Sequence, residues 1–248
     1  MPGHDIPEPL RRLWRLPEQA SRLGRPSSLD TDVVVQAAVR LADRDGLGAA
    51  TLPRVAADLG VTAMSLYRHV GSKLELLDLM VDFASTTPSA PTEDRGWREG
   101  LTVWADELWD LYRSRPWIVR VPVHGAPTGP NQLAWLERAL TVIADTDLDW
   151  AEKVGYVMLL SGYVRQSILL TQDLSEGRDD AEQQAESERR YGLAMRDLVD
   201  SRRFPQLSDM FDSDVFDGPS VPTETTARND FHGGLETILD GIAARLDG

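Results

Sequence analysis

The chain contains 248 residues, of which 42% are hydrophobic, so it can form a substantial core and is not globally disordered. It contains no cysteine, which excludes disulfide bonds, thiolate nucleophiles and cysteine-ligated zinc sites. Its first ten residues carry acids and prolines where a signal peptide has a basic start and an apolar run, and no apolar stretch is long enough to cross a bilayer. We therefore expect a cytoplasmic protein.

The formal net charge of −14 is distributed unevenly along the chain. Residues 1–83 carry 10 basic and 11 acidic side chains, whereas the remaining residues carry 16 basic and 29 acidic ones. Within residues 60–73 there are two cations, Arg68 and Lys73, and no acid. Because DNA binding requires a local basic face, this distribution permits a nucleic-acid partner at the N-terminal third of the chain but does not by itself indicate one.

The N-terminal residues are predicted to form an arm ahead of the first domain. Residues 1–28 are rich in proline and lack sustained periodicity, so we expect a flexible arm with a short helix near Leu10–Leu16. A helix then begins after Asp30, a favourable N-cap residue, and ends before Gly46. Its apolar residues recur at helical spacing and form one stripe: Val34, Ala37, Ala38, Leu41 and Ala42.

Two short helices separated by a tight turn follow. The first begins after Thr51 and ends at Gly60, and the second is capped by Thr62 and ends at Gly71. This spacing is typical of a helix-turn-helix. Packing of Leu66 on the preceding helices would leave the opposite face of the second short helix free to enter a major groove.

Helical patterns continue to the C-terminus, and no run of alternating β-branched residues indicates a strand, so we predict an all-α fold. Ser72 caps a fourth helix, which precedes a loop over residues 85–96. We expect a DNA-binding domain over 29–75 and a larger helical domain over 76–248. The larger domain is predicted to contain helices over 97–115, 130–145, 149–171, 188–201 and 230–246, a polar stretch over 172–188 and an irregular segment over 204–222.

The segment Ala49–Asp78 matches the pattern AAT-L-x-x-V-A-x-x-L-G-V-T-x-x-x-L-Y-x-H-V-x-S-K-x-x-L-L-D. This pattern resembles the tetracycline-repressor (TetR) family of bacterial regulators, and its L-Y-x-H-V-x-x-K core is specific for that family. The resemblance implies that the first helices of the domain bind operator DNA, that C-terminal helices form a homodimer, and that a cavity in the larger domain binds a small effector. It also implies a repressor that its ligand releases from DNA.

The resemblance assigns roles to the residues that match. Tyr67 would contact the DNA backbone and nearby bases, His69 is an adjacent contact, and Lys73 would meet a phosphate. The base-reading face is small or apolar, so we expect contacts to thymine methyl groups. Where the family prototype has a base-reading arginine this chain has Pro53, and Arg54 or Thr51 would compensate. The full predicted DNA-contact set is Thr51, Arg54, Thr62, Ala63, Met64, Ser65, Tyr67, Arg68, His69, Ser72 and Lys73.

Structural interpretations of the same residues stay open at this point. Tyr67 could pack on the first helix of the domain, His69 could be structural, and Lys73 could be a solvated helix-end charge. Upstream, Gly24-Arg25-Pro26 has the short core of arms that enter an A·T-rich minor groove, although a plain flexible tail is the favoured interpretation.

Two apolar stripes in the C-terminal region predict a dimer interface. The helix over 149–171 carries Val154, Val157, Met158, Tyr163 and Ile168 on a broad stripe. The final helix carries a second stripe of Leu235, Ile238, Leu239, Ile242 and Leu246, in a segment that resembles the last helix of tetracycline-repressor-like proteins. These two helices from each subunit would form a four-helix bundle, unless both stripes are buried inside one subunit.

Aromatic residues crowd the segment Trp97–Trp135 and suit a cavity for an apolar or aromatic ligand, although aromatics at helical spacing more often form a core. A magnesium–tetracycline site is not supported, because Ser89, Val121 and Thr171 occupy the aligned positions of the prototype's ligands. We predict no metal and no cofactor. The candidate ligand contacts are Trp104, Leu108, Trp117, Val121, His124, Trp135, Arg165 and Gln166.

The alternative function classes are an enzyme and a helical ligand- or protein-binding module that does not bind DNA. The four histidines are scattered, and no metalloprotease, hydrolase or phosphate-loop motif is present, so catalysis is disfavoured. The set of Tyr67, His69 and Lys73 favours DNA binding over the second alternative. We therefore predict a ligand-responsive, sequence-specific transcriptional regulator.

Overall fold

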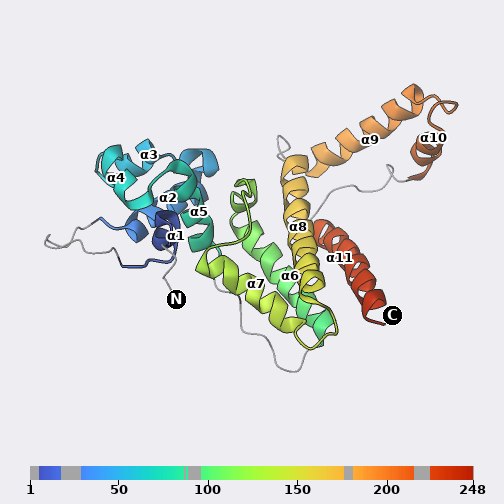
Figure 1. The fold of residues 1–248 in the computed structure, drawn as a ribbon. Helices are drawn as coiled ribbons and strands as arrows, with labels where there is room; N and C mark the ends of the chain where they lie inside the picture. The colour runs from blue at the N-terminus through green and yellow to red at the C-terminus, as the bar shows by residue number, and fades with distance from the viewer. Residues whose placement is uncertain are drawn as a thin grey trace, which may run out of the picture. The chain divides into compact units, whose positions relative to one another are not determined.

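A computed structural model describes residues 6–17, 29–86, 88, 96–175, 181–214 and 224–247. These residues form helices and no strand (Figure 1), which confirms the predicted all-α class. The chain divides into two compact units, one of residues 1–168 with 242–248 and the other of residues 169–241. No helix in the described ranges is both long enough and apolar enough to span a membrane.

The helices of the predicted DNA-binding domain over 29–75, and the fourth helix that begins at its end, lie within a few residues of their expected positions. They are α2 (Thr31–Asp45), α3 (Leu52–Asp58), α4 (Ala63–Val70) and α5 (Lys73–Ala84), with a 3-10 turn, η1 (Leu47–Ala49), after α2. Asp30 caps α2 by accepting a hydrogen bond from the Val33 N–H at 2.8 Å. The apolar stripe of α2 is buried, and α2 contacts α3, α4 and α5.

Two glycines end the short helices in the left-handed conformation. Gly60 has φ +66° after α3, and Gly71 has φ +68° after α4, so both helices end where the sequence predicts. A Cβ atom at Gly71 would also meet the carboxylate of Glu75, but that flexible side chain can move away, so the positive φ is the constraint on this position. The turn between α4 and α5 therefore depends on a residue without a side chain.

The predicted N-terminal arm is partly helical and packed. Helix α1 (Glu8–Leu13) confirms the short helix expected near Leu10–Leu16, and α1 contacts α5. Its Leu13 is only 6% exposed, so the expectation of a flexible arm is wrong for the described residues 6–17. The proposed minor-groove core, Gly24–Pro26, lies outside the described residues.

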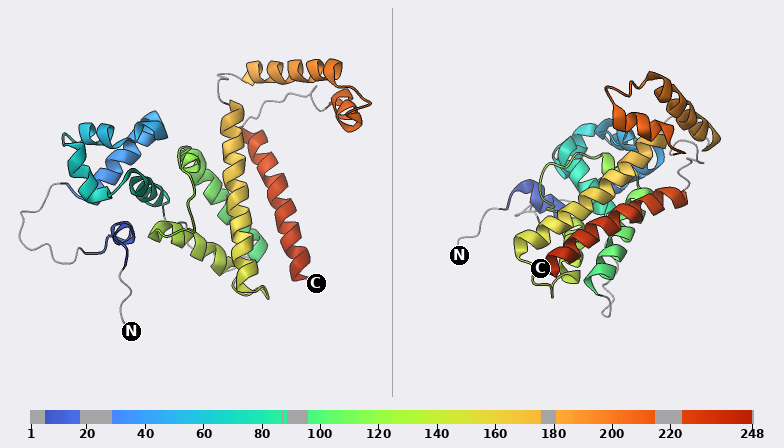
Figure 2. Two further views of the ribbon diagram at one scale, coloured as in Figure 1. Left: turned by 45° about the horizontal axis from the view of Figure 1, so that its top comes forward. Right: turned by 90° about the vertical axis from the view of Figure 1, so that its right-hand side faces the viewer.

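Helices α6 (Trp97–Ser114) and α7 (Pro130–Val142) lie side by side and are separated in sequence by a 3-10 turn, η2 (Ile118–Arg120) (Figure 2). Trp104 of α6 and Trp135 of α7 meet edge to face, with ring centroids 6.2 Å apart. Arg138 of α7 is buried and forms an ion pair with Glu107 of α6. Helix α7 also contacts α5, which connects this pair to the DNA-binding domain.

The C-terminal helices are α8 (Trp150–Ser175), α9 (Ala181–Leu198), α10 (Pro205–Asp212) and α11 (Glu224–Leu246). The helices α9 and α11 begin earlier than predicted, and α10 lies in the segment 204–222 that was expected to be irregular. Pro205 is compatible with α10 because it occupies the first turn of the helix. Phe211 of α10 is buried and meets Tyr191 of α9 edge to face at 5.8 Å, which gives this short helix a packing partner.

Candidate nucleic-acid interface

Helix α4 is held in place by its buried face and by a cap at its N-terminal end. Leu66 and Val70 are fully buried, and α4 contacts α2, α3 and α5. Thr62 caps the helix, since its hydroxyl accepts a hydrogen bond from the Ser65 N–H at 3.3 Å. Recognition of base edges requires a helix held rigidly in this way.

The opposite face of α4 points to solvent. Met64 is 77% exposed and Tyr67 is 46% exposed, and Arg68 is exposed as well. Tyr67 therefore does not lie buried against α2, in contrast to the alternative that the sequence left open. The hydroxyl of Ser65 donates to the Thr62 carbonyl at 2.6 Å, so the exposed side chains of this face are the apolar Met64, the aromatic Tyr67 and the cationic Arg68.

Arg54 of helix α3 is already paired with the acidic side chain of Asp45. The guanidinium of Arg54 lies 2.8 Å from a carboxylate oxygen of Asp45, and the Thr51 hydroxyl accepts from the Arg54 N–H at 3.4 Å. Hydrogen bonds from Arg44, together with the charge of Arg54, lower the pKa of Asp45. Arg54 would have to exchange this partner for a phosphate or a base on DNA.

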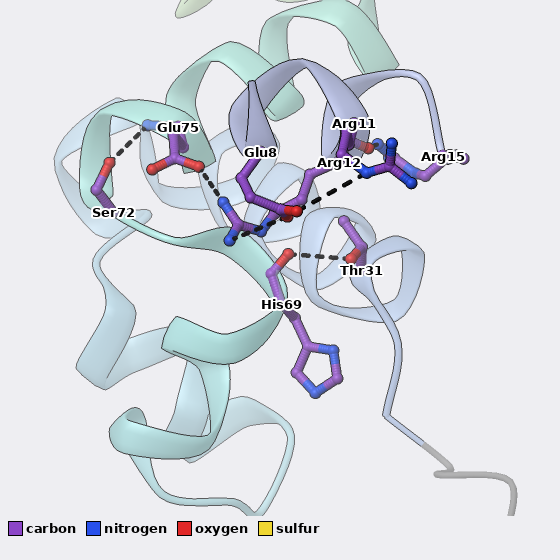
Figure 3. Close-up of polar contacts among 8 residues, drawn as sticks. All are labelled: Glu8, Arg11, Arg12, Arg15, Thr31, His69, Ser72 and Glu75. Carbon is purple, nitrogen blue, oxygen red and sulfur yellow. Dashed lines mark hydrogen bonds and ion pairs between the residues drawn. The ribbon is translucent and has the colours of Figure 1, made fainter. Parts of the chain in front are cut away.

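The N-terminal end of α5 presents its backbone N–H groups and a lysine next to α4. Ser72 caps α5 by accepting from the Glu75 N–H at 3.1 Å, and Lys73 is exposed on the first helical turn. The carbonyl of His69 accepts from the Thr31 hydroxyl at 3.0 Å, whereas its imidazole points away from the ionic contacts (Figure 3). The backbone of His69 thus helps to join α4 to α2, and its side chain is half-buried.

A buried carboxylate ties α5 to α7. One oxygen of Asp82 accepts from the backbone N–H groups of Asn131 and Gln132 at 2.9 and 3.1 Å, on the first turn of α7. The N-cap residue of α7 is Gly129, which has no side chain, so Asp82 supplies the cap from another helix. Burial raises the pKa of Asp82, and the two N–H groups partly oppose that rise.

A second tie joins α2 to the end of α6. The Asp43 carboxylate accepts from the indole N–H of Trp117 at 2.6 Å and lies 3.5 Å from the guanidinium of Arg115. Arg115 also donates to the carbonyl of Ala84, the last residue of α5, at 3.0 Å. Sequence reasoning missed Asp43 and Asp82, although an acid inside the apolar run Leu79–Phe83 was a signal for Asp82.

The candidate ligand residues divide into buried and exposed ones. Five are buried: Trp104, Leu108, Trp117, Val121 and Trp135. Two of their indole groups donate to main-chain oxygens, Trp104 to the Trp135 carbonyl at 3.0 Å and Trp135 to the Thr86 carbonyl at 2.8 Å. Arg165 donates to the Val121 carbonyl at 2.8 Å, and His124 and Gln166 are exposed.

A pocket of about 640 Å³ lies beside this group. Of the candidate ligand residues, only Trp135 lines it. The others that line it come from α2, α6 and the linker after α5: Asp43, Thr86, Pro88, Glu107, Asp110, Leu111, Ser114 and Arg115. Ser89 lies outside the described residues, and within the described ranges no group of three or more metal-ligating side chains comes together.

Two family models match this chain. The model of the tetR family of bacterial regulatory proteins matches residues 34–80, which include the helix-turn-helix and most of α5. The model of the tetracyclin repressor-like C-terminal domain matches residues 90–246. The two ranges together cover the helix-turn-helix and most of the C-terminal region.

Individual relatives agree with the family models. The HTH-type transcriptional repressor DrrR1 of Streptomyces coeruleorubidus is 36% identical over 243 residues, which are 96% of this chain and 86% of the relative. The Streptomyces coelicolor TetR family protein ActR, solved in complex with actinorhodin, is 25% identical over 90% of this chain and 100% of its own, with a TM-score of 0.72. BioQ, solved with its double-stranded DNA operator, is 24% identical over 58% of this chain and 88% of its own; its TM-score of 0.53 shows a shared fold. The resemblance predicted from residues 49–78 is confirmed, and the chain belongs to the TetR family, whose members regulate transcription by ligand-responsive binding to DNA.

Proposed function

We propose that this protein is a transcriptional repressor that binds operator DNA as a homodimer and leaves it when a small apolar or aromatic ligand binds. The observation that carries the proposal is the rigid, outward-facing α4, with Leu66 fully buried behind it and Met64 77% exposed in front. The name of DrrR1 as a repressor supports repression, and the complex of ActR with actinorhodin supports a ligand. Binding to operator DNA places the protein in the cytoplasm, and no catalytic role is proposed.

On DNA, α4 lies in the major groove and the start of α5 meets the backbone. Ala63 and Met64 offer apolar contacts to thymine methyl groups, and Tyr67 reaches the backbone and neighbouring bases. Lys73 and the capped end at Ser72 bind a phosphate, since a helix N-terminus and a cation both favour an anion. Thr51 and Thr62 act chiefly as helix caps, because both hydroxyls accept main-chain hydrogen bonds.

Two contacts provide a route from the ligand to DNA: that of Asp82 with the first turn of α7, and that of Asp43 with Trp117 and Arg115. The pocket is lined by Asp43, which forms the second of these contacts, and by Thr86. Thr86 follows α5, and its carbonyl accepts a hydrogen bond from the indole N–H of Trp135. A ligand seated there displaces the linker and α6, and the Asp82 cap transmits the shift between α7 and α5. The angle of α5 then changes the separation of the two recognition helices, so that they no longer match successive major grooves.

The exposed face of α8 provides the dimer surface. Trp150, Val154 and Met158 are 72%, 37% and 69% exposed and recur at the spacing of one helix face. Val157 and Ile168 of the predicted stripe are buried in the chain, as are Leu235, Leu239 and Ile242 of α11. The predicted stripe of α8 therefore serves both the interior of the subunit and the dimer, whereas these three residues of α11 serve the interior.

Selection from random DNA tests the proposal. Wild-type protein is used to enrich duplexes from a random-sequence library, and binding of the enriched duplex is compared with that of a scrambled duplex in a gel shift. The proposal predicts one enriched motif with two-fold symmetry, and loss of binding by a Tyr67→Ala, Lys73→Ala double variant. Failure of the wild-type protein to enrich any motif would contradict DNA binding and favour a helical ligand- or protein-binding module.

A further inference from the structure

Helix α1 and the residues after it contact three separate parts of the same unit. The Arg12 guanidinium lies 2.5 Å from a carboxylate oxygen of Glu75, on the first turn of α5. The Trp14 indole N–H donates to the carbonyl of Thr128 at 2.9 Å, in the loop before α7. Arg15 lies 2.7 Å from the carboxylate of Asp32 in α2. This short stretch of chain therefore contacts both predicted domains, and Figure 3 shows Arg12 pointing toward Glu75 at the start of α5.

The C-terminal end of α1 has an unfavourable backbone conformation, which its contacts stabilise. Arg15 has φ +51°, in the left-handed region that disfavours a residue with a side chain by roughly 1 kcal/mol. The N–H of Leu16 donates to the Arg11 carbonyl at 2.9 Å, and the N–H of Arg15 donates to the Arg12 carbonyl at 3.1 Å. These bonds form a Schellman ending, and with Leu13 buried they show a packed element instead of a tail.

Glu75 occupies a position where a carboxylate commonly closes a capping box. Ser72 and Glu75 have the S-x-x-E spacing, in which the carboxylate bonds back to the serine N–H. Here the Ser72 N–H donates instead to the Val70 carbonyl at 2.8 Å, and the Glu75 carboxylate lies over Gly71. Arg12 therefore provides the charged partner of a carboxylate that lies two residues from Lys73.

We propose that Arg12 is a positioning residue for DNA binding, which holds and neutralises Glu75 beside the phosphate-binding start of α5. This inference rests on the proposed function. An uncompensated carboxylate there would repel phosphates, since charges interact over a Debye length of about 10 Å at 0.1 M salt. With Glu75 paired to Arg12, the first turn of α5 presents the positive charge of Lys73 and its helix N-terminus.

A double-mutant cycle on the enriched operator duplex tests this role. Arg12→Ala is expected to weaken operator binding by about three- to tenfold through repulsion from Glu75. Glu75→Gln in the Arg12→Ala background is expected to restore the affinity to within about twofold of wild type, because the unpaired charge is then absent. The salt dependence of Arg12→Ala is expected to be shallower than that of wild type, because salt screens the repulsion between Glu75 and phosphate, and Glu75→Gln in the same background is expected to restore the wild-type slope. Arg12→Lys, which keeps the charge, is expected to bind within about twofold of wild type.

Each other outcome overturns the inference. Wild-type affinity in Arg12→Ala shows that the pair is irrelevant to binding, and a salt slope that stays reduced in the double variant shows that Arg12 contacts DNA directly. If Arg12→Ala unfolds, weak binding by a folded Arg12→Lys variant excludes the charge role. A double variant that binds as weakly as Arg12→Ala also excludes it. Failure of wild-type protein to bind any duplex overturns the proposed function itself, whereas wild-type binding without an Arg12 effect overturns only this inference.

Discussion

Lys73 is the residue whose role on DNA can be measured most simply. It is exposed on the first turn of α5, and a cation that contacts a phosphate contributes to affinity without regard to sequence. Lys73→Ala should weaken binding about equally to specific and scrambled duplexes and reduce the slope of log affinity against log salt by about one. Fluorescence anisotropy across salt concentrations measures both. Arg190→Ala, which removes an exposed cation from α9, is the control and should leave the slope unchanged.

Asp82 should make stability depend on pH. Burial raises its pKa above the ordinary value of 3.8, so the folded protein retains this proton at a pH where the unfolded chain has lost it. The contribution of this group to stability is therefore present at low pH and lost as pH rises through the raised pKa. Asparagine in the Asp82→Asn variant cannot titrate. The unfolding free energy of wild type minus that of the variant, measured in urea titrations, should therefore fall as pH rises from 3.8 through the raised pKa of Asp82. A difference that stays constant or rises with pH would show that this carboxyl does not titrate as proposed.

Residues whose role depends on near neighbours could be predicted, and those with distant partners could not. The N-caps Asp30, Thr62 and Ser72 each accept from an N–H three residues later, so the local sequence contains all the information. Asp82 and Asp43 meet partners that are 49 and 74 residues away. No pattern within one helix shows such a contact.

At the scale of the element, the start of α7 depends on its contact with α5. A Cβ atom at Gly129 would overlap the Asp82 carboxylate, which supplies the N-cap of α7. Gly129→Ala should therefore lower the free energy of unfolding by about 1–2 kcal/mol through loss of the cap. Gly125→Ala in the same loop has open space around it and should change stability by less than about 0.5 kcal/mol. Equal effects of the two substitutions in urea unfolding would contradict the tie between α5 and α7.

Long, periodic helices could be predicted from the sequence, and short helices that depend on tertiary contacts could not. Helices α2 to α8 lie within a few residues of their predicted bounds because stripes and caps recur locally. Helix α10 could not be predicted, since its Asp, Ser and Pro content is typical of a loop and its stability depends on Phe211 meeting Tyr191. The packing of α1 likewise depends on Glu75, 63 residues away from Arg12.

At the scale of the whole molecule, dimerisation through α8 is testable by charge insertion. Met158 is 69% exposed on the apolar face that includes Trp150 and Val154. Met158→Glu should convert a dimer into a monomer in sedimentation velocity, because a desolvated charge at an apolar interface strongly opposes association. Val123→Glu is the control, since Val123 is 70% exposed in the loop before α7. If Met158→Glu sediments as a dimer, this face of α8 is not the interface.

Specific, electrostatic binding of DNA can be measured on duplex DNA upstream of the gene that encodes this protein. Affinity is measured for this fragment and for a scrambled one over a series of salt concentrations. We expect a specific complex at least about a thousandfold tighter than the complex with the scrambled fragment, with log affinity falling linearly with log salt. Equal affinity for the two fragments together with a flat salt dependence would contradict it.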